Sequence, residues 1–204
     1  DHLSRTITPQ GIPNPGQADR FSVIETVNDM LGPKGFEEAT KLVDEMANRL
    51  SSRQAIAAVR RKQLESLIDD KVLQTATNSE LMDSILYLLF PNFSPWGGFQ
   101  TQITYRHRPN GMDVDSCLMD IYFLESCEQG TETPPDAAKI QLSADQSFSE
   151  VPGFEALASI FDQDANNLPE VQRGLHASNK GHVISASYQE LRIRHFHATL
   201  DKYL

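Results

Sequence analysis

The chain has 204 residues and a formal net charge of −10, with 18 Lys and Arg against 28 Asp and Glu. Hydrophobic residues make up 39% and charged residues 23%, which is typical of a folded globular protein and excludes a disordered one. The most apolar run, residues 85–90, is far too short to cross a membrane, so no membrane partner is expected. Because the first residue is Asp1 rather than Met, we expect the chain to begin after processing or truncation.

The charge is concentrated in one block, since residues 112–170 carry thirteen acidic side chains and one basic side chain. A protein that binds phosphates gathers Lys and Arg on one face, and no such footprint is present, so nucleic acid is not expected as a partner. The only cysteines, Cys117 and Cys127, are too few and too far apart for a disulfide framework or a cysteine-ligated cluster. They predict buried thiols in a reducing compartment, the cytoplasm.

The first half of the chain predicts one strand and then helices. Residues 2–8 have β-branched character and predict a strand, and the Pro- and Gly-rich residues 9–16 predict a loop. An apolar stripe predicts a helix over 36–50, and a more polar pattern predicts a second, surface-lying helix over 56–68. A third helix is expected from Asn78 to Leu89, where Pro91 ends it.

The second half predicts a hairpin and then helices again. Residues 99–105 alternate in polarity, residues 108–111 form a turn with Asn-Gly at its tip, and the returning strand 116–126 is apolar on both faces, which predicts a central strand. The polar residues 128–149 predict an exposed excursion. Helices are expected over 152–167, 169–178 and 187–204. This order predicts an α+β fold with helices packed on an antiparallel sheet.

Asp164 is the most informative residue of the predicted helix over 152–167. Helical geometry places Asp164 on the same face as four apolar residues, Leu157, Ile160, Phe161 and Leu168. Asp162 is rotated away from this face and is expected to face water. A carboxylate directed into an apolar interior is costly unless a cation, a metal or several hydrogen bonds hold it. The pattern leaves two structural alternatives open: a salt bridge to a nearby Arg, or a helix that ends before Asp164.

The histidines do not form a metal-binding pattern. Residues two apart on a helix point to nearly opposite sides, so His195 and His197 cannot bind one ion. His197 shares the apolar stripe of the last helix and is expected to be a packing histidine. His176 and His182 are expected in a loop, and His107 at the hairpin tip.

Aromatic residues crowd the entry to the first hairpin strand, where they form either core or one wall of an aromatic-lined pocket. Trp96-Gly97-Gly98 predicts a close-packed turn, and no nucleophile elbow, phosphate-binding glycine loop or zinc-protease motif is present. The hypothesised pocket residues are Phe90, Phe93, Trp96 and Phe161.

Several segments taken together resemble a known family. They are LFPNF (89–93), YRHRPNG (105–111) with DSC (115–117), FDQDANNLPEVQRGL (161–175) and YQELRIRHFH (188–197). Their order along the chain and their amino-acid sequences resemble the C-terminal catalytic domain of the large (α) subunit of Rieske-type aromatic-ring-hydroxylating oxygenases. The resemblance covers nearly the whole chain, so residues 1–204 are interpreted as a partial catalytic domain.

The resemblance implies a helix-grip fold (START/Bet v 1-like), in which an antiparallel sheet curls around a long C-terminal helix. It also implies a mononuclear non-haem Fe(II) held by two histidines and one carboxylate, with positions open for O₂. The position that matches the family's carboxylate is Asp164, the residue that the helical pattern also singles out. The family's two histidine ligands precede the segment that begins at His2, and the N-terminal Rieske domain with its [2Fe–2S] cluster is not in this chain.

The resemblance implies an oxidoreductase of aromatic hydrocarbon catabolism, a dioxygenase or monooxygenase. Electrons from NAD(P)H would pass through a ferredoxin or reductase to the Rieske cluster and then to the iron. The expected assembly is a homotrimer, possibly with a small β subunit, and the 204-residue chain alone is expected to be inactive. Two alternatives stay open: a helix-grip module that binds an apolar ligand without catalysis, and a purely structural oligomerisation domain.

Overall fold

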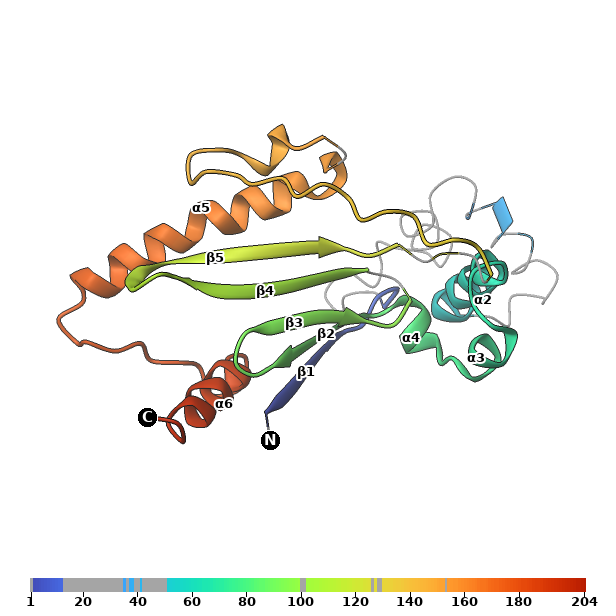
Figure 1. Cartoon of the computed structure of the whole chain (residues 1–204). Coiled ribbons are helices and arrows are strands. Elements are labelled where there is room, and N and C mark those ends of the chain that lie inside the picture. Colours follow the sequence, from blue (N-terminus) through green and yellow to red (C-terminus); the bar gives the residue numbers. More distant parts are fainter. Residues whose placement is uncertain are drawn as a thin grey trace. The chain divides into compact units, whose positions relative to one another are not determined.

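The structure, a computed structural model, describes residues 2–12, 51–99, 102–125, 127, 130–152 and 154–204, together with Gly35, Glu37, Glu38 and Lys41 (Figure 1). The helix predicted over 36–50 falls mostly outside these residues. The chain divides into two compact units, and each is described by itself. The first unit comprises Asp1–Glu132 with His195–Leu204, and the second comprises Thr133–Arg194.

The first unit is built on a five-stranded sheet whose strands follow one another in sequence order. Every neighbouring pair is antiparallel, which confirms the predicted α+β class with an antiparallel sheet. The predicted first strand is present, and the hairpin strands are present with shifted ends. The strands are β1 (Leu3–Thr8), β2 (Ser84–Leu89), β3 (Phe93–Gly97), β4 (Ile103–Asn110) and β5 (Asp113–Phe123).

The register decides which side chains share a face of the sheet, because side chains alternate along a strand. Ser4 pairs with Leu88, and Trp96 pairs with Leu86, two residues earlier on β2. Ser4 and Trp96 therefore lie on the same face. Phe93 is three residues before Trp96 on β3 and lies on the opposite face.

Helices α2 (Ser52–Leu64), α3 (Asp70–Thr75) and α4 (Asn78–Met82) precede the second strand. The prediction that the second helix lies on the surface is wrong, because α2 supplies most of the buried cluster. The polar residues of α2 occupy one side of the helix and leave a narrow apolar stripe on the other side. This stripe packs against the buried side chains of α4. The cluster consists of Ala55, Ile56, Ala57, Val59, Leu81 and Met82.

The predicted helix from Asn78 to Leu89 is correct only over its first turn. Thr77 caps α4 in a capping box with Glu80, and the helix ends where Asp83 adopts an extended backbone. Residues Ser84–Leu89 form β2 between β1 and β3. A short apolar run is compatible with either state, and here pairing with strands on both sides decides it.

The prediction that the returning hairpin strand is central is also wrong. Strand β5 is the last strand of the described sheet and pairs only with β4, and its side chains are mostly exposed. The turn is displaced as well, since β4 extends through Asn110 and Gly111 takes the positive φ of 62° at the tip. The expected burial of the thiols is not found, because Cys117 and Cys127 are both exposed and free.

The second unit contains the 3-10 helix η1 (Phe148–Glu150) and the long helix α5 (Glu155–Ala177). Two helices separated at Pro169 were expected, but α5 is continuous through Pro169. The described residues of the excursion before η1 are mostly exposed, as predicted. Helix α6 (Leu191–Leu200) is shorter than the helix expected over 187–204, and its part from His195 onward belongs to the first unit. Among the described residues, no helix combines the length and apolarity that a membrane span requires.

Candidate metal ligand and aromatic residues

Asp164 lies within α5, well away from both ends of that helix. The apolar face predicted around it is only partly buried: Phe161 is 7% exposed, whereas Ile160 is 54% exposed, Leu168 is 59% exposed and Asp164 is exposed as well. The buried side of α5 carries Phe161 and Ala158. The expectation that Asp164 points into an apolar interior is therefore not met in the second unit.

Neither structural alternative for Asp164 is found. The helix does not end before this residue, because α5 continues to Ala177. Within the described ranges, no arginine or lysine forms an ion pair with Asp164, and its side chain makes no hydrogen bond. Among the residues that the structure describes, Asp164 therefore has neither an ion-pair partner nor a hydrogen-bond partner for its carboxylate.

Asp162 was expected to face water, but the structure gives it a specific partner segment. It is half-buried, and Oδ1 accepts a hydrogen bond from the Phe148 amide at 2.6 Å. Oδ2 accepts from the hydroxyls of Ser147 and Ser149, each at 2.5 Å. The hydrogen bonds from Ser147 and Ser149 hold the pKa of Asp162 below its ordinary value. Sequence reasoning missed this contact because Asp162 and its partners are more than a dozen residues apart.

The hydrogen bonds of Asp162 hold η1 against α5 and thereby bring three phenylalanines together. The ring of Phe161 lies 5.4 Å from that of Phe148 and 5.1 Å from that of Phe154, centroid to centroid. Phe161 is only 7% exposed, so its ring is part of the small core of the second unit.

The other three hypothesised pocket residues belong to the first unit and do not share one surface. Phe90 lies in the turn after β2, and its ring packs on Phe196 and Tyr203 with centroid distances of 5.5 and 5.4 Å. Trp96 is half-buried on β3, and its Nε1 is buried without a hydrogen-bond partner in the described part of the chain. Phe93 is 39% exposed on the opposite face of the sheet. The substrate pocket of these four residues stays a prediction.

A model of one protein family, the ring hydroxylating alpha subunit (catalytic domain), matches residues 28–204. The chain belongs to this family. Its match covers all of the second unit and most of the first, and it includes Asp164, Phe90, Trp96 and Phe161. No curated protein and no solved structure matches the chain. Membership in the ring-hydroxylating family indicates a ring-hydroxylating oxygenase, an oxidoreductase.

The ring-hydroxylating family generally uses non-haem iron, and the described residues do not form a complete site for it. Across the parts of the chain that the structure describes, no three His, Cys, Asp or Glu residues gather where they could hold a metal ion. The unpaired carboxylate of Asp164 suits the hard-ligand position of such a site. No histidine of the described residues lies beside Asp164 in such a group.

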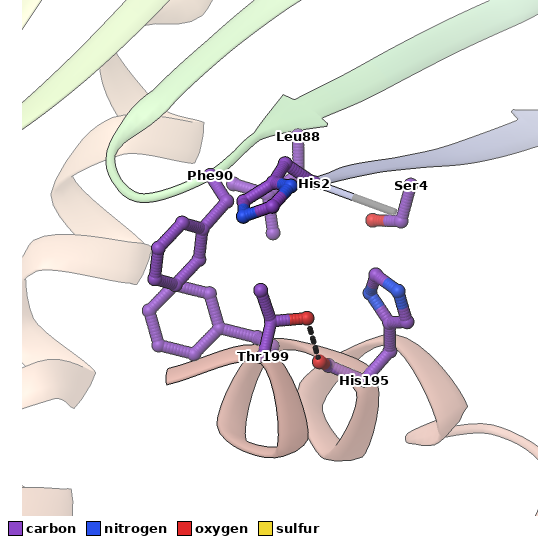
Figure 2. A pocket seen from close by; sticks show the side chains of 7 residues that line it. His2, Ser4, Leu88, Phe90, His195 and Thr199 are labelled. Atoms are coloured by element: carbon purple, nitrogen blue, oxygen red, sulfur yellow. Dashed lines mark hydrogen bonds between the residues drawn. The ribbon is translucent and has the colours of Figure 1, made fainter. Parts of the chain in front are cut away.

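His182 lies between α5 and α6, in a loop as predicted, but three other histidines are placed differently from the prediction. His107 lies within β4 rather than at the hairpin tip, and His176 lies in the last turn of α5 rather than in a loop. The expected packing role of His197 is not found, because His197 is exposed. His195 is the half-buried histidine of α6, and it lines a small cavity against the sheet (Figure 2).

Proposed function

We propose that this chain is the catalytic part of a ring-hydroxylating oxygenase that uses non-haem Fe(II) and O₂ to hydroxylate an aromatic substrate. The family match over residues 28–204 supports the reaction class. The observation that carries the iron assignment is the place of Asp164 in the segment FDQDANNLPEVQRGL (161–175), which lies within the family match and resembles the family's carboxylate-bearing helix. This segment lies within α5, where Asp164 is exposed and forms no ion pair with the described residues, so its carboxylate is accessible to a metal ion.

In this proposal Asp164 is the carboxylate ligand of the iron, and two histidines outside these 204 residues are the other ligands. We therefore propose that the 204-residue chain by itself does not hydroxylate. Activity then requires the parent protein that supplies the histidines.

The proposed electron route begins at NAD(P)H and passes through a ferredoxin or reductase to a Rieske [2Fe–2S] cluster in a separate domain. The only two cysteines of the chain, Cys117 and Cys127, do not have the spacing of a Rieske cluster motif, so the cluster ligands must come from other residues. A homotrimer, with or without a small β subunit, and a cytoplasmic location are part of the same proposal.

For the substrate, we propose that aromatic side chains contact the ring that is hydroxylated. Phe90 and Trp96 are the candidates in the first unit. Phe161 stays a separate candidate in the second unit, where its ring packs against Phe148 and Phe154. Phe93 belongs to the same hypothesis, although its place on the other face of the sheet separates it from Trp96. Rigid aromatic side chains suit an apolar, planar substrate.

The test uses the parent protein with its electron donors, NAD(P)H, ¹⁸O₂ and a panel of aromatic compounds. The proposal predicts a hydroxylated product that carries ¹⁸O and depends on NAD(P)H. The 204-residue chain alone, assayed in the same mixture, should form no product. Absence of labelled product from an iron-loaded, cluster-loaded parent across the panel would contradict the proposed reaction.

A further inference from the structure

A small cavity lies in the first unit, between the start of the sheet and the C-terminal helix α6 (Figure 2). Its volume is about 10 Å³, which is close to the smallest space that admits one water molecule. An aromatic ring needs a cavity of about 150 Å³, so this space cannot hold the substrate. The cavity is lined by His2, Ser4, Leu88, Phe90, His195, Phe196 and Thr199.

Ser4 presents an unsatisfied polar atom at this cavity. Its Oγ is buried and has no hydrogen-bond partner in the described structure. The pairing of Ser4 with Leu88 fixes the side chain on the cavity side of the sheet. A buried hydroxyl without a partner lowers stability, and native proteins satisfy most such groups with protein atoms or water.

Helix α6 brings two further polar groups to the same cavity. The half-buried imidazole of His195 makes no hydrogen bond to the described residues, so its ring nitrogens are available. Thr199 donates its hydroxyl to the backbone carbonyl of His195 at 2.8 Å and keeps acceptor capacity on Oγ1. Figure 2 shows the Ser4 hydroxyl and the His195 ring on the same side of the cavity.

The remaining walls are formed by His2, Leu88, Phe90 and Phe196, and none of the lining residues is a carboxylate, a lysine or an arginine. The imidazole of His2 is already hydrogen-bonded to the hydroxyl of Tyr203. The rings of Phe90 and Phe196 pack against each other at 5.5 Å and close one side of the space. The site therefore suits a neutral molecule of one heavy atom that both donates and accepts hydrogen bonds.

We infer that one internal water molecule occupies this cavity and joins Ser4 Oγ of β1 to the imidazole of His195 on α6. Water satisfies the Ser4 hydroxyl and a ring nitrogen of His195 at once, and the acceptor capacity of Thr199 offers a third partner. The water thus helps to attach the C-terminal helix to the first strand. On the adjacent side, the ring contacts of Phe90 with Phe196 and Tyr203 also hold the C-terminal residues against the sheet.

The sign of a stability change separates an occupied cavity from an empty one. If water is present, Ser4→Ala removes one of its partners and lowers the Tm of the full chain by about 2–4 °C. If the cavity is dry, Ser4→Ala removes an unsatisfied hydroxyl and leaves the Tm equal or higher. Thr8→Ala, an exposed hydroxyl on the same strand, is the matched control and should leave the Tm unchanged.

A double-mutant cycle tests whether His195 is the second partner. Combined with His195→Leu, the Ser4→Ala change should lose at least half of its effect on Tm, because the water has already lost one of its two main partners. Electron density at high resolution should show one water within hydrogen-bond distance of Ser4 Oγ. Strict additivity of the two changes, an unchanged or raised Tm for Ser4→Ala, or empty density would each overturn the inference.

Discussion

Asp83, which is 3% exposed, accepts hydrogen bonds from three separate parts of the first unit. Arg53 of α2 donates to both carboxylate oxygens at 2.7 and 2.9 Å, the Gln10 amide donates at 2.9 Å, and Ser79 donates at 2.7 Å. Burial raises the pKa of Asp83, but the hydrogen bonds from Arg53, Ser79 and Gln10 together lower it below its ordinary value. This one carboxylate ties the end of the first strand to two helices.

Removing the Arg53 cation from its ion pair with Asp83 should strongly destabilise the folded first unit. Arg53→Met leaves the Asp83 carboxylate buried without its main partner, and we expect the free energy of unfolding to fall by about 3 kcal/mol. Lys62→Met, at an exposed position of the same helix, is the control and should change it by less than about 0.5 kcal/mol. Urea unfolding of both variants measures the difference, and equal midpoints would contradict this account.

The same carboxylate sets a pH dependence with a definite sign. Because the pKa of Asp83 is lower in the folded state than in the unfolded state, its contribution to stability is present above the ordinary Asp value of about 4. That contribution is lost as the pH falls through the lowered folded value. The free energy of unfolding should therefore drop more steeply below pH 4 in the wild type than in Asp83→Asn, and parallel curves would contradict the prediction.

Asp162 makes a local prediction in the second unit. Asp162→Ala removes the acceptor of the Phe148 amide, so the amide protons of η1 should exchange with solvent faster. Asp145→Ala, an exposed carboxylate before η1, should leave those rates unchanged. Since the pKa of Asp162 is lowered, protection in the wild type should persist to pH values below the ordinary Asp value. Exchange measured by mass spectrometry decides this, and unchanged rates in Asp162→Ala would show that the contact is unimportant.

At the scale of elements, local chemistry predicted the start of α4 and the first strand, and tertiary pairing decided the nature of the segment that follows α4. The cap before α4 could be predicted from Asn78-Ser79-Glu80, although Thr77 is the residue that caps. The change from helix to strand at Asp83 could not be predicted. The apolar run 85–90 has no helical or strand period of its own, and only its pairing with β1 and β3 makes it a strand. Likewise, the apolar character of β5 favoured a central strand, whereas edge position depends on the whole sheet.

The junction between α4 and β3 depends on one glycine. Gly98 has a φ of 78°, and a Cβ there would lie 2.6 Å from the carbonyl oxygen of Glu80, which also accepts the Phe99 amide. Gly98→Ala adds backbone strain and a clash, and should destabilise by more than about 2 kcal/mol. Gly111→Ala has the strain without the clash and should cost about 1 kcal/mol. Thermal unfolding of both variants tests the order, and the reverse order would contradict it.

At the scale of the whole molecule, the two units differ in the size of their cores. Nearly all buried apolar side chains belong to the first unit, whereas Ala158 and Phe161 are the buried ones described in the second. We expect backbone amides of α5 to exchange faster than those of β2 and β3, because opening α5 exposes little apolar surface. Peptide-level hydrogen exchange of the full chain measures this, and equal protection of α5 and the central strands would contradict it.

Two arguments from the sequence pointed to Asp164: the helical pattern and the resemblance to the family. The structure corrects the first of them. The helical pattern correctly grouped Asp164 with Ile160 and Leu168, but burial of that stripe is not observed. The motif around Asp164 pointed to the ring-hydroxylating family, and the family match over 28–204 confirms that resemblance. The Asp162 contacts and the cavity at Ser4 could not be predicted, because both depend on pairings between distant segments.

The most direct test of the central claim is the iron content of the parent oxygenase carrying Asp164→Ala. Metal analysis should show loss of most of the mononuclear iron, with the Rieske cluster absorbance and the far-UV circular dichroism unchanged. Glu170→Ala removes an exposed carboxylate of the same helix, one that pairs with Arg173, and should keep full iron. Full iron occupancy in Asp164→Ala, or equal loss in Glu170→Ala, would contradict the assignment of Asp164 as the carboxylate ligand.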